Sequence, residues 1–335
     1  MMREQLLPRF PDIPAETVLE LNTPFDWQPN TTPKTGVIMT HGLFGSPFFM
    51  RDFGRYFVER GIHARSLLLP GHCTDPRDLT RINLEAYQTT VKTHIDAMKD
   101  TVDELYLLGF SFGGLLNLDY LLRHPDKKIK GLVMLCPALG LASRWAFLLP
   151  ALDKSKLLRC YHSEKETDYA RYQSMAVRAA HQVYKLIKTL PPIRDMMLPK
   201  LMLVASADDE VVSSPTILHF FNETQTTDKR LIWYGQHNNS EQKNVSYRNS
   251  YFPDDNVVNA SHISLLFSPN NSYYGKDGSA RHALYHSCSF KAKHAVYGAI
   301  NKKTLQQYDV YRASFNPDFE FLAQQLSDFI NEKNT

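Results

Sequence analysis

A serine flanked by glycines is the feature of this sequence with the clearest chemical potential. Ser111 stands in Gly109-Phe-Ser-Phe-Gly-Gly114, which matches the pattern G-x-S-x-G. Because an apolar run precedes this pattern and an apolar helical pattern follows it, we expect the serine on a sharp strand-to-helix turn. Glycines on either side let neighbouring backbone approach such a turn, and the helix N-terminus favours developing negative charge. The motif therefore predicts a nucleophile.

Three carboxylates after a late predicted strand are candidates for the acid of a catalytic triad. A serine hydroxyl needs a general base and an acid that orients the base, and here both should follow the serine along the chain. The strand predicted at 201–205 is followed by Asp208, Asp209 and Glu210. We assign Asp209 as the acid and keep Asp208 as the alternative. A third interpretation is that these carboxylates only cap a helix beginning near Ser214.

The base is expected among the histidines that follow the last predicted strand. Of the 13 histidines, those that satisfy this chain order are His237, His262, His282, His286 and His294. Small and apolar residues flank His262, which suits a tight loop that enters a buried site. The others lie in a polar stretch or in a late insertion, so we assign His262 as the base.

Two backbone N–H groups are expected to stabilise the oxyanion of an acyl-transfer reaction. One belongs to Phe112, directly after the serine. The other belongs to the loop His41–Gly45, where Gly42 lets the backbone turn, and we assign Leu43 with Phe44 as the alternative. Loss of one such donor typically raises the barrier by ~2.7–4 kcal/mol. We expect His41 and also His72, in the later Pro-Gly-His turn, to fix loops by hydrogen bonds.

The elements that must position these residues alternate between short apolar strands and helices. Strands are predicted at 35–41, 62–69, 105–109, 129–136, 201–205 and 230–234, and helices at 49–60, 84–101, 112–123, 172–190 and 319–330. We expect Asp318 to cap the last helix. The alternation predicts an α/β fold, with a mostly parallel sheet flanked by helices on both faces.

Three segments interrupt this alternation. Residues 139–195 are too many for a simple crossover and predict a helical cap, which divides the core into residues 1–138 and 196–335. The stretch near 235–256 is rich in Asn and Ser and predicts a surface excursion. The stretch near 270–311 predicts a further insertion.

The composition is that of an ordinary globular protein. The 335 residues are 43% hydrophobic and carry a net charge of +3, which excludes disorder as the main state and gives no reason to expect nucleic-acid binding. The cysteines Cys73, Cys136, Cys160 and Cys288 form no CxxC pair, so we expect buried, reduced thiols and no metal site.

The sequence shows neither a signal peptide nor a membrane span. The first residues lack the apolar stretch of about 7–15 residues that secretion requires, and no window approaches the ~18 apolar residues of a transmembrane helix. We expect a cytoplasmic protein, with signal-independent export and the oligomeric state left open.

Together these motifs resemble the α/β-hydrolase superfamily, and within it bacterial carboxylesterases and monoacylglycerol-lipase-like serine hydrolases. The resemblance covers roughly residues 35–136 and 201–262 and the last helix, and it rests on His41-Gly-Leu-Phe-Gly45, Leu69–His72, Gly109–Gly114, Asp209–Val212 and His262. It implies the α/β-hydrolase fold with a helical cap insertion. It also implies Ser111 as nucleophile, Asp209 as acid, His262 as base, and Leu43 and Phe112 as oxyanion donors.

An apolar cleft is predicted beside the serine. We expect Phe44 and the cap residue Trp145 to bind substrate, whereas Phe110 is expected to belong to the core. Because each buried CH₂ contributes ~0.8 kcal/mol, such a cleft suits an acyl chain. We therefore expect hydrolysis of short- to medium-chain carboxylic esters through an acyl-enzyme, on a small ester or lipid-like substrate and without a metal or organic cofactor. The alternatives are thioester, amide or C–C cleavage on the same triad, or a non-catalytic binding protein.

Overall fold

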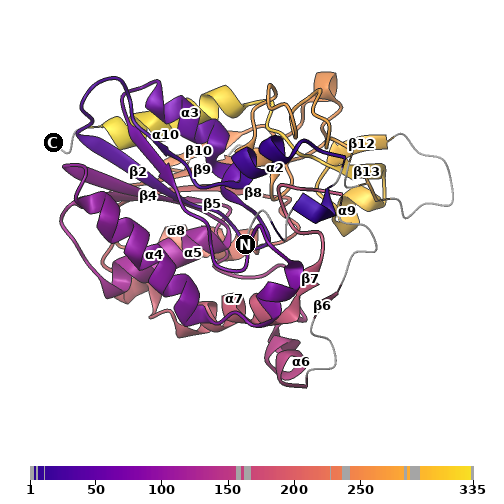
Figure 1. Ribbon diagram of the computed structural model, residues 1–335, viewed down its shortest axis with the longest axis horizontal. Coiled ribbons are helices and arrows are strands. Elements are labelled where there is room, and N and C mark those ends of the chain that lie inside the picture. Colours follow the sequence, from indigo (N-terminus) through magenta and orange to yellow (C-terminus); the bar gives the residue numbers. More distant parts are fainter. Residues whose placement is uncertain are drawn as a thin grey trace.

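An eight-stranded sheet forms the centre of the computed structural model, with helices on both faces (Figure 1). The structure describes residues 4, 7–10, 12–155, 160–161, 167–226, 228–235, 242–282, 285–286 and 295–332. The strand order is β1-β3-β2-β4-β5-β8-β9-β10, and every neighbouring pair is parallel except β1 with β3. The predicted α/β-hydrolase fold, with a mostly parallel sheet, is confirmed.

All six predicted strands lie in this sheet, because each is an apolar run that two layers of helices can cover. The eight strands of the sheet, of which β1 and β10 were not predicted, are β1 (Asp26–Trp27), β2 (Thr35–Thr40), β3 (His63–Ser66), β4 (Glu104–Phe110), β5 (Ile129–Leu135), β8 (Lys200–Ser206), β9 (Lys229–Tyr234) and β10 (Val245–Arg248). β3 ends three residues earlier than predicted. The Leu69 N–H donates to His41 Nε2 at 3.1 Å, so the chain turns toward the neighbouring loop.

Two helices cover one face of the sheet, and three others cover the opposite face (Figure 1). The first group is α3 (Arg51–Val58) and α10 (Phe319–Asn331), and the second is α4 (Leu84–Lys99), α5 (Phe112–Arg123) and α8 (Ser214–Glu223). The helix predicted at 49–60 begins as the 3₁₀ turn η2 (Pro47–Met50), where the Ser46 hydroxyl accepts from the Phe48 N–H.

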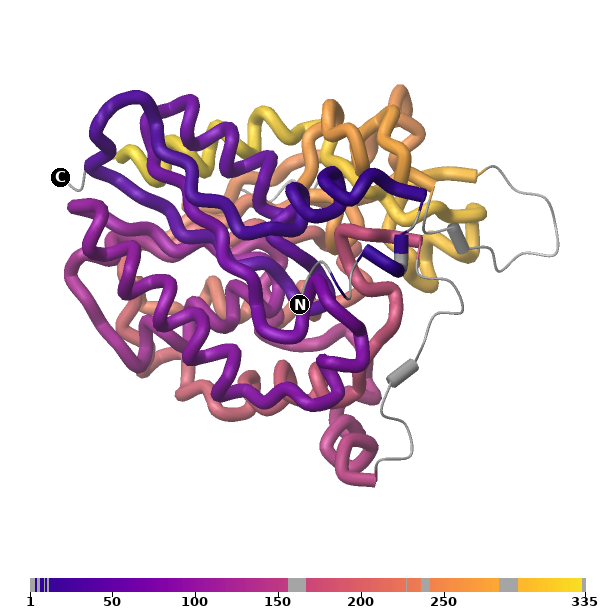
Figure 2. The backbone as a smooth tube through the Cα atoms, viewed as in Figure 1, coloured from indigo at the N-terminus to yellow at the C-terminus, as the bar shows by residue number. Residues whose placement is uncertain are grey.

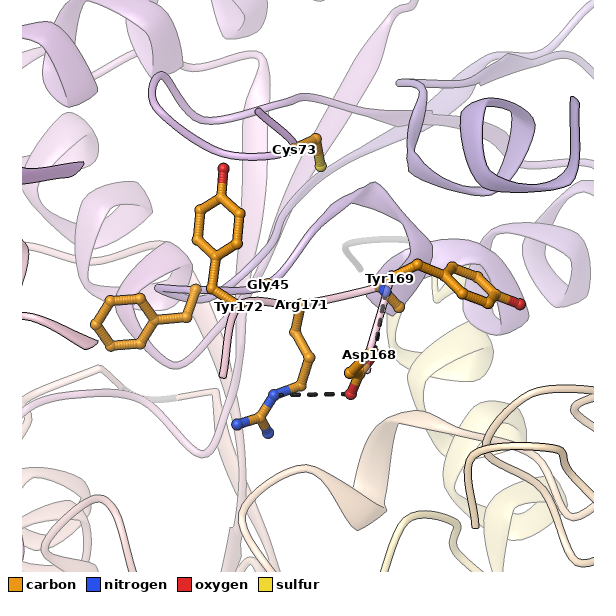
Figure 3. Close-up of a pocket in the computed structure, with 8 residues that line it drawn as sticks. Gly45, Cys73, Asp168, Tyr169, Arg171 and Tyr172 are labelled. Carbon is orange, nitrogen blue, oxygen red and sulfur yellow. Dashed lines mark hydrogen bonds and ion pairs between the residues drawn. The ribbon is translucent and has the colours of Figure 1, made fainter. Parts of the chain in front are cut away.

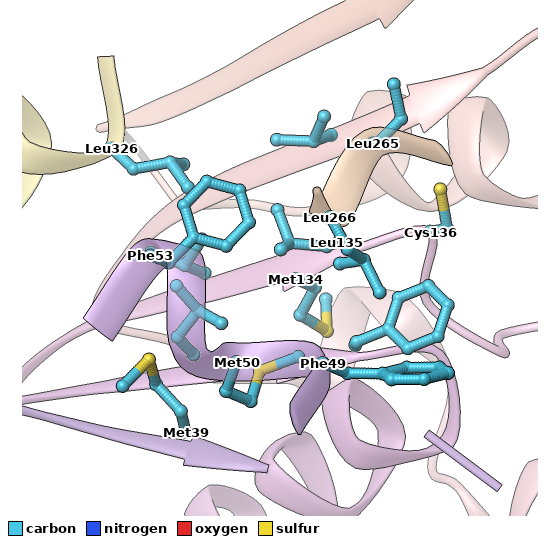
Figure 4. Close-up of a cluster of buried hydrophobic side chains, with 14 of the residues drawn as sticks. Met39, Phe49, Met50, Phe53, Met134, Leu135, Cys136, Leu265, Leu266 and Leu326 are labelled. Atoms are coloured by element: carbon cyan, nitrogen blue, oxygen red, sulfur yellow. The ribbon is translucent and has the colours of Figure 1, made fainter. Parts of the chain in front are cut away.

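The core on the α3 side joins segments from both halves of the chain (Figure 4). Phe49, Met50 and Phe53 from η2 and α3 are buried there beside Leu265 of η7 (Ser264–Leu266) and Leu326 of α10. Burial of each such side chain stabilises the fold by roughly 1.5–3 kcal/mol. The loop that carries His262 therefore continues directly into the core.

The described part of the segment predicted as a cap contains two α-helices, two 3₁₀ turns and a short hairpin. These are η4 (Ala146–Leu148), α6 (Leu149–Ser155), β6 (Cys160–Tyr161) paired with β7 (Met175–Ala176), α7 (Val177–Thr189) and η5 (Ile193–Asp195). α6 projects from the body of the molecule (Figures 1 and 2). The helix predicted at 172–190 begins only at Val177, because the Tyr172 N–H donates to the Phe44 carbonyl at 2.7 Å and holds the preceding chain extended.

The later segments differ from expectation. The surface excursion predicted near 235–256 is wrong for Val245–Arg248, which form the edge strand β10 beside β9. Residues near 270–311 contain β11 (Tyr285–His286), β12 (Ala295–Gly298), α9 (Lys302–Leu305) and β13 (Asp309–Arg312), with β13 in the centre of a three-stranded sheet. In Figure 2 the orange and yellow trace of these late segments gathers at one end of the main sheet.

Several shorter features complete the described chain. The remaining elements are η1 (Leu7–Arg9), α2 (Ala15–Asn22), η3 (Pro76–Thr80) and η6 (Pro253–Asp255). Asp318 precedes α10 as predicted, but its side chain makes no cap bond and instead accepts from Arg248 and Tyr234. Cys73 and Cys136 are buried free thiols, whereas the side chains of Cys160 and Cys288 lie outside the described residues. Within the described chain, no helix is long and apolar enough to cross a membrane.

Candidate active site

Ser111 lies on the turn between β4 and α5 in a strained backbone conformation. Its φ is 53° and its ψ is −117°, in a region that non-glycine residues rarely adopt. A Cβ on Gly109 would lie 2.4 Å from the Gly114 nitrogen, and one on Gly113 would lie 2.1 Å from the Thr40 carbonyl oxygen. Both positions therefore require glycine, which is the physical basis of the sequence motif.

A chain of two hydrogen bonds joins Ser111, His262 and Asp209. His262 Nε2 lies 3.0 Å from Ser111 Oγ, and His262 Nδ1 lies 2.7 Å from Asp209 Oδ2. Asp209 as acceptor requires the proton on Nδ1, so the Nε2 lone pair faces the serine hydroxyl. The structure thus brings together the three residues assigned to the triad, within the distances that general-base catalysis needs.

Two carboxylates in the turn after β8 lie in different environments. Burial alone raises the pKa of Asp209, but the His262 charge and hydrogen bond and the N–H groups of Val212 and Val211 outweigh burial and hold the pKa below its usual value. Burial raises the pKa of Asp208, whose carboxylate lies 3.9 Å from Lys303 Nζ and makes no bond to His262. The alternative acid is therefore not in position, and Ser213 rather than a carboxylate caps α8.

Of the other candidate histidines, His282 is the one whose side chain the structure describes, and it lies away from this site. His282 Nδ1 lies 2.9 Å from the Tyr297 hydroxyl, in the late insertion. His237 and His294 lie outside the described residues, and of His286 only the backbone is described. Among the described side chains, His262 is the histidine that contacts Ser111.

Two buried histidines hold the loop that was assigned to the oxyanion hole. His72 Nε2 accepts the Phe44 N–H at 3.1 Å, and its Nδ1–H donates to the Pro70 carbonyl at 3.1 Å. His41 Nδ1–H donates to the Gly42 carbonyl at 2.8 Å. Because the Phe44 N–H is occupied by His72, Leu43 is the better candidate of the two for the second oxyanion donor.

A cavity of about 400 Å³ opens over Ser111 and His262. Its walls are mainly apolar and include Phe44 and Trp145, the two side chains predicted to bind substrate. Trp145 is 58% exposed, so it stands at the margin of the cavity. Phe110 is buried as expected, yet it also lines the cavity, with its ring centroid 4.7 Å from that of His262.

Comparison with known proteins identifies the family. The family model described as serine aminopeptidase, S33, matches residues 31–237. The chain belongs to this hydrolase family. The matched range includes Ser111 and Asp209 and ends before His262.

Individual relatives agree with this family. The hydrolase is 23% identical over 203 residues to a carboxylesterase of Bacillus subtilis (strain 168), covering 59% of this chain and 81% of the relative. It is 23% identical over 200 residues to a thermostable monoacylglycerol lipase of Bacillus sp. (strain H-257), covering 59% and 79%. A soluble variant of Saccharomyces cerevisiae monoglyceride lipase shares the fold with a TM-score of 0.54 at 13% identity, over 67% of this chain and 85% of that one. The chain is an α/β-hydrolase enzyme that resembles esterases and monoacylglycerol lipases.

Two charged residues of this hydrolase site, Arg171 and Arg312, were not identified from the sequence, and Glu210, one of the three candidate acids, contacts the histidine in another way. Glu210 Oε2 accepts the His262 backbone N–H at 3.1 Å, and Arg171 and Arg312 line the cavity. Glu210 therefore bonds to the backbone of His262 rather than to its imidazole. No local pattern marks the two arginines, because they come from the cap segment and from β13.

One group of side chains in the hydrolase has the spacing of metal ligands. The donor atoms of Cys136, Asp209 and His262 lie within 4.8 Å of one another, the one such group found in the described part of the chain. Burial raises the pKa of the Cys136 thiol well above its usual value, so sulfur is protonated, whereas metals bind thiolate. Asp209 and His262 are already bonded to each other. These residues therefore do not fit a metal site.

Proposed function

We propose that this hydrolase cleaves carboxylic esters of short to medium acyl chains through a Ser111–His262–Asp209 triad. The observation that carries the proposal is the hydrogen-bonded chain from Asp209 through His262 to Ser111, inside a mainly apolar cavity. Esterase and lipase relatives support the same class of reaction. A volume of about 400 Å³ lies toward the small end of ligand pockets, which span roughly 300–1,000 Å³.

The proposed mechanism forms an acyl-enzyme. His262 Nε2 takes the Ser111 hydroxyl proton as Oγ attacks the ester carbonyl carbon, and the N–H groups of Leu43 and Phe112 bind the oxyanion. The C–O bond to the alcohol then breaks, and His262 gives its proton to the departing oxygen. Water attacks the acyl-enzyme with His262 again as base. The carboxylic acid leaves, and the proton returns to Ser111.

We also propose that residues 139–195 act as a cap that shapes the acyl site, between the core segments 1–138 and 196–335. Trp145 and Leu149 from the α6 side, together with Met175 and Val183 around α7, line the cavity. Phe44 lies on the core side of the same cavity. A substrate chain would therefore be held between the cap and the oxyanion loop.

The test replaces the proposed nucleophile. We expect Ser111→Ala to lower kcat for p-nitrophenyl butyrate and octanoate by at least about a thousandfold, because the acyl-enzyme has no oxygen on which to form. The matched control is Ser279→Ala, at an exposed serine that does not line the cavity and whose loss leaves turnover unchanged. A fluorophosphonate probe should label the wild type and the control but not Ser111→Ala. Turnover that survives in Ser111→Ala would overturn the proposal.

A further inference from the structure

Two arginine side chains reach the otherwise apolar cavity from different parts of the chain. Arg171 belongs to the cap segment, and Arg312 ends strand β13. Their side chains are only 16% and 19% exposed. Because removal of a guanidinium from water is unfavourable unless its N–H groups are hydrogen-bonded, such a pair in an active-site cavity calls for a partner.

The carboxylate beside Arg171 does not supply that partner. Arg171 Nε lies 3.9 Å from Asp168 Oδ2, which is beyond hydrogen-bond distance. Asp168 is instead occupied by the Tyr273 hydroxyl at 3.1 Å, the Tyr274 hydroxyl at 2.5 Å and the Ala170 N–H at 3.0 Å. In Figure 3 the two terminal nitrogens of Arg171 point away from Asp168. Asp168 therefore lies behind Arg171 and leaves the end of its guanidinium available.

Arg312 is in a similar position. Its Nε lies 3.0 Å from Glu210 Oε1, but neither atom has a hydrogen-bond partner, so the geometry is that of an ion pair alone. The other Glu210 oxygen accepts the His262 N–H. Among the described residues, neither Arg171 nor Arg312 donates a side-chain hydrogen bond.

The two guanidinium groups also act on each other. Burial lowers the pKa of Arg312, and the Arg171 charge lowers it further, against the opposing effect of Glu210. Two cations that repel each other in a cavity with low exposure are stabilised when an anion binds between them. The planar fork of arginine matches the geometry of carboxylate and phosphate groups.

We propose that Arg171 and Arg312 form an anion subsite, and that the preferred substrates are esters whose alcohol part carries a carboxylate or a phosphate. This inference rests on the proposed function. The alcohol side is assigned because His262 must give its proton to the departing alcohol oxygen, and Glu210 places Arg312 beside the backbone of His262. The apolar walls then remain for the acyl chain.

The experiment compares charged and neutral substrates with the same octanoyl chain. One pair is octanoyl-glycerol 3-phosphate against monooctanoylglycerol, and the other is 4-octanoyloxybenzoate against its methyl ester. We expect the wild type to prefer the anionic member by about tenfold or more in kcat/KM, because hydrogen bonds to charged groups are among the stronger ones. A preference in one pair alone identifies the anion as phosphate or carboxylate.

The arginine variants test whether the subsite causes this preference. In Arg171→Gln and Arg312→Gln the ratio of kcat/KM for the anionic substrate to kcat/KM for the neutral substrate should fall toward one. The control Arg194→Gln, at a side chain that is 79% exposed, should keep the wild-type ratio. Because this ratio compares two substrates of the same variant, it does not change when a shift of His262, transmitted through Glu210, lowers activity on both substrates equally. Arg312→Lys keeps the charge without the planar fork, so its ratio should lie between those of the wild type and Arg312→Gln. It takes the place of Arg312→Gln in the test if the glutamine variant does not fold.

Three results would overturn the inference while the proposed function stands. These are equal kcat/KM for both members of each pair, a ratio that the arginine variants leave unchanged, or a preference only for a charge on the acyl side, as in mono-p-nitrophenyl adipate. Failure of the proposed function looks different, because then no ester is cleaved or turnover survives in Ser111→Ala.

Discussion

At the scale of single residues, the site depends on which of two adjacent carboxylates faces the histidine. Asp209 accepts the Val211 and Val212 N–H groups on one oxygen and the His262 Nδ1–H on the other. Asp208 is directed toward Lys303. The backbone bonds thus orient the Asp209 carboxylate before a substrate binds, and its lowered pKa keeps it charged at neutral pH.

Replacement of these two residues one at a time gives a direct prediction. Asp209→Asn should lower kcat for p-nitrophenyl octanoate by about 10³–10⁴-fold, because an amide favours the wrong histidine tautomer and stabilises the imidazolium poorly. Asp208→Asn should change kcat by less than about threefold, within the range of substitutions away from the reacting groups. Equal losses in the two variants would contradict the assignment of the acid.

At the scale of elements, the loop after β2 is held by histidines rather than by apolar packing alone. His41 accepts from Leu69 and His72 accepts from Phe44, so two side chains join this loop to the turn that follows β3. Burial lowers the pKa of His72 to about 4, and it lowers that of His41 well below its usual value. Both bonds require a neutral imidazole whose Nε2 carries no proton.

This arrangement predicts a loss of stability in acid. The pKa of His72 is about 4 in the folded state and 6.5 when unperturbed, so the unfolded state binds more protons between these values. The free energy of unfolding therefore falls as the pH drops through this window, by on the order of 2 kcal/mol from this group between pH 7.5 and pH 5. Urea unfolding at the two pH values measures the change.

A histidine variant isolates the contribution of this group. His72→Gln, whose amide can still donate and accept, should lose less stability than the wild type between the two pH values. The control His219→Gln, at an exposed histidine, should behave as the wild type does. If the free energy of unfolding of His72→Gln fell between the two pH values as much as that of the wild type, the acid sensitivity would arise from another group.

At the scale of the whole molecule, the cap segment and the late insertion are joined through a buried charge. Asp168, just before Arg171, accepts hydrogen bonds from Tyr273 and Tyr274. The Tyr274 ring also packs against Phe49 of the core, with a centroid distance of 6.3 Å. The late insertion, which lies outside the range matched by the family model, therefore supports the segment around Asp168 and one wall of the cavity.

Removal of a single hydroxyl tests this link. Tyr274→Phe keeps the packing but deprives a buried carboxylate of one donor, so we expect the free energy of unfolding to fall by about 1.5–3 kcal/mol. Tyr251→Phe, at a tyrosine that is 47% exposed, should change it by less than about 0.5 kcal/mol. Urea unfolding at pH 7.5 measures both, and equal stability of Tyr274→Phe and wild type would contradict the link.

The sequence by itself determined the features that are local. The six predicted strands follow from apolar runs, the position of Ser111 from glycines that backbone contacts demand, and the choice of His262 from its small neighbours. β10 was missed because Val245–Arg248 is a half-buried edge strand without an apolar run. The strands were thus predicted or missed according to the strength of the short-range pattern.

Only the tertiary structure decided which residues from distant segments of the chain meet at the site. Asp209 over Asp208 and Leu43 over Phe44 are choices between chain neighbours, and hydrogen bonds to distant segments favour the first member of each pair. The meeting of Arg171 and Arg312 in one cavity likewise joins segments that no periodicity relates. The physical reason is that apolar periodicity reports which face of an element is buried, whereas the partner of a polar group is set by the packing of the whole chain.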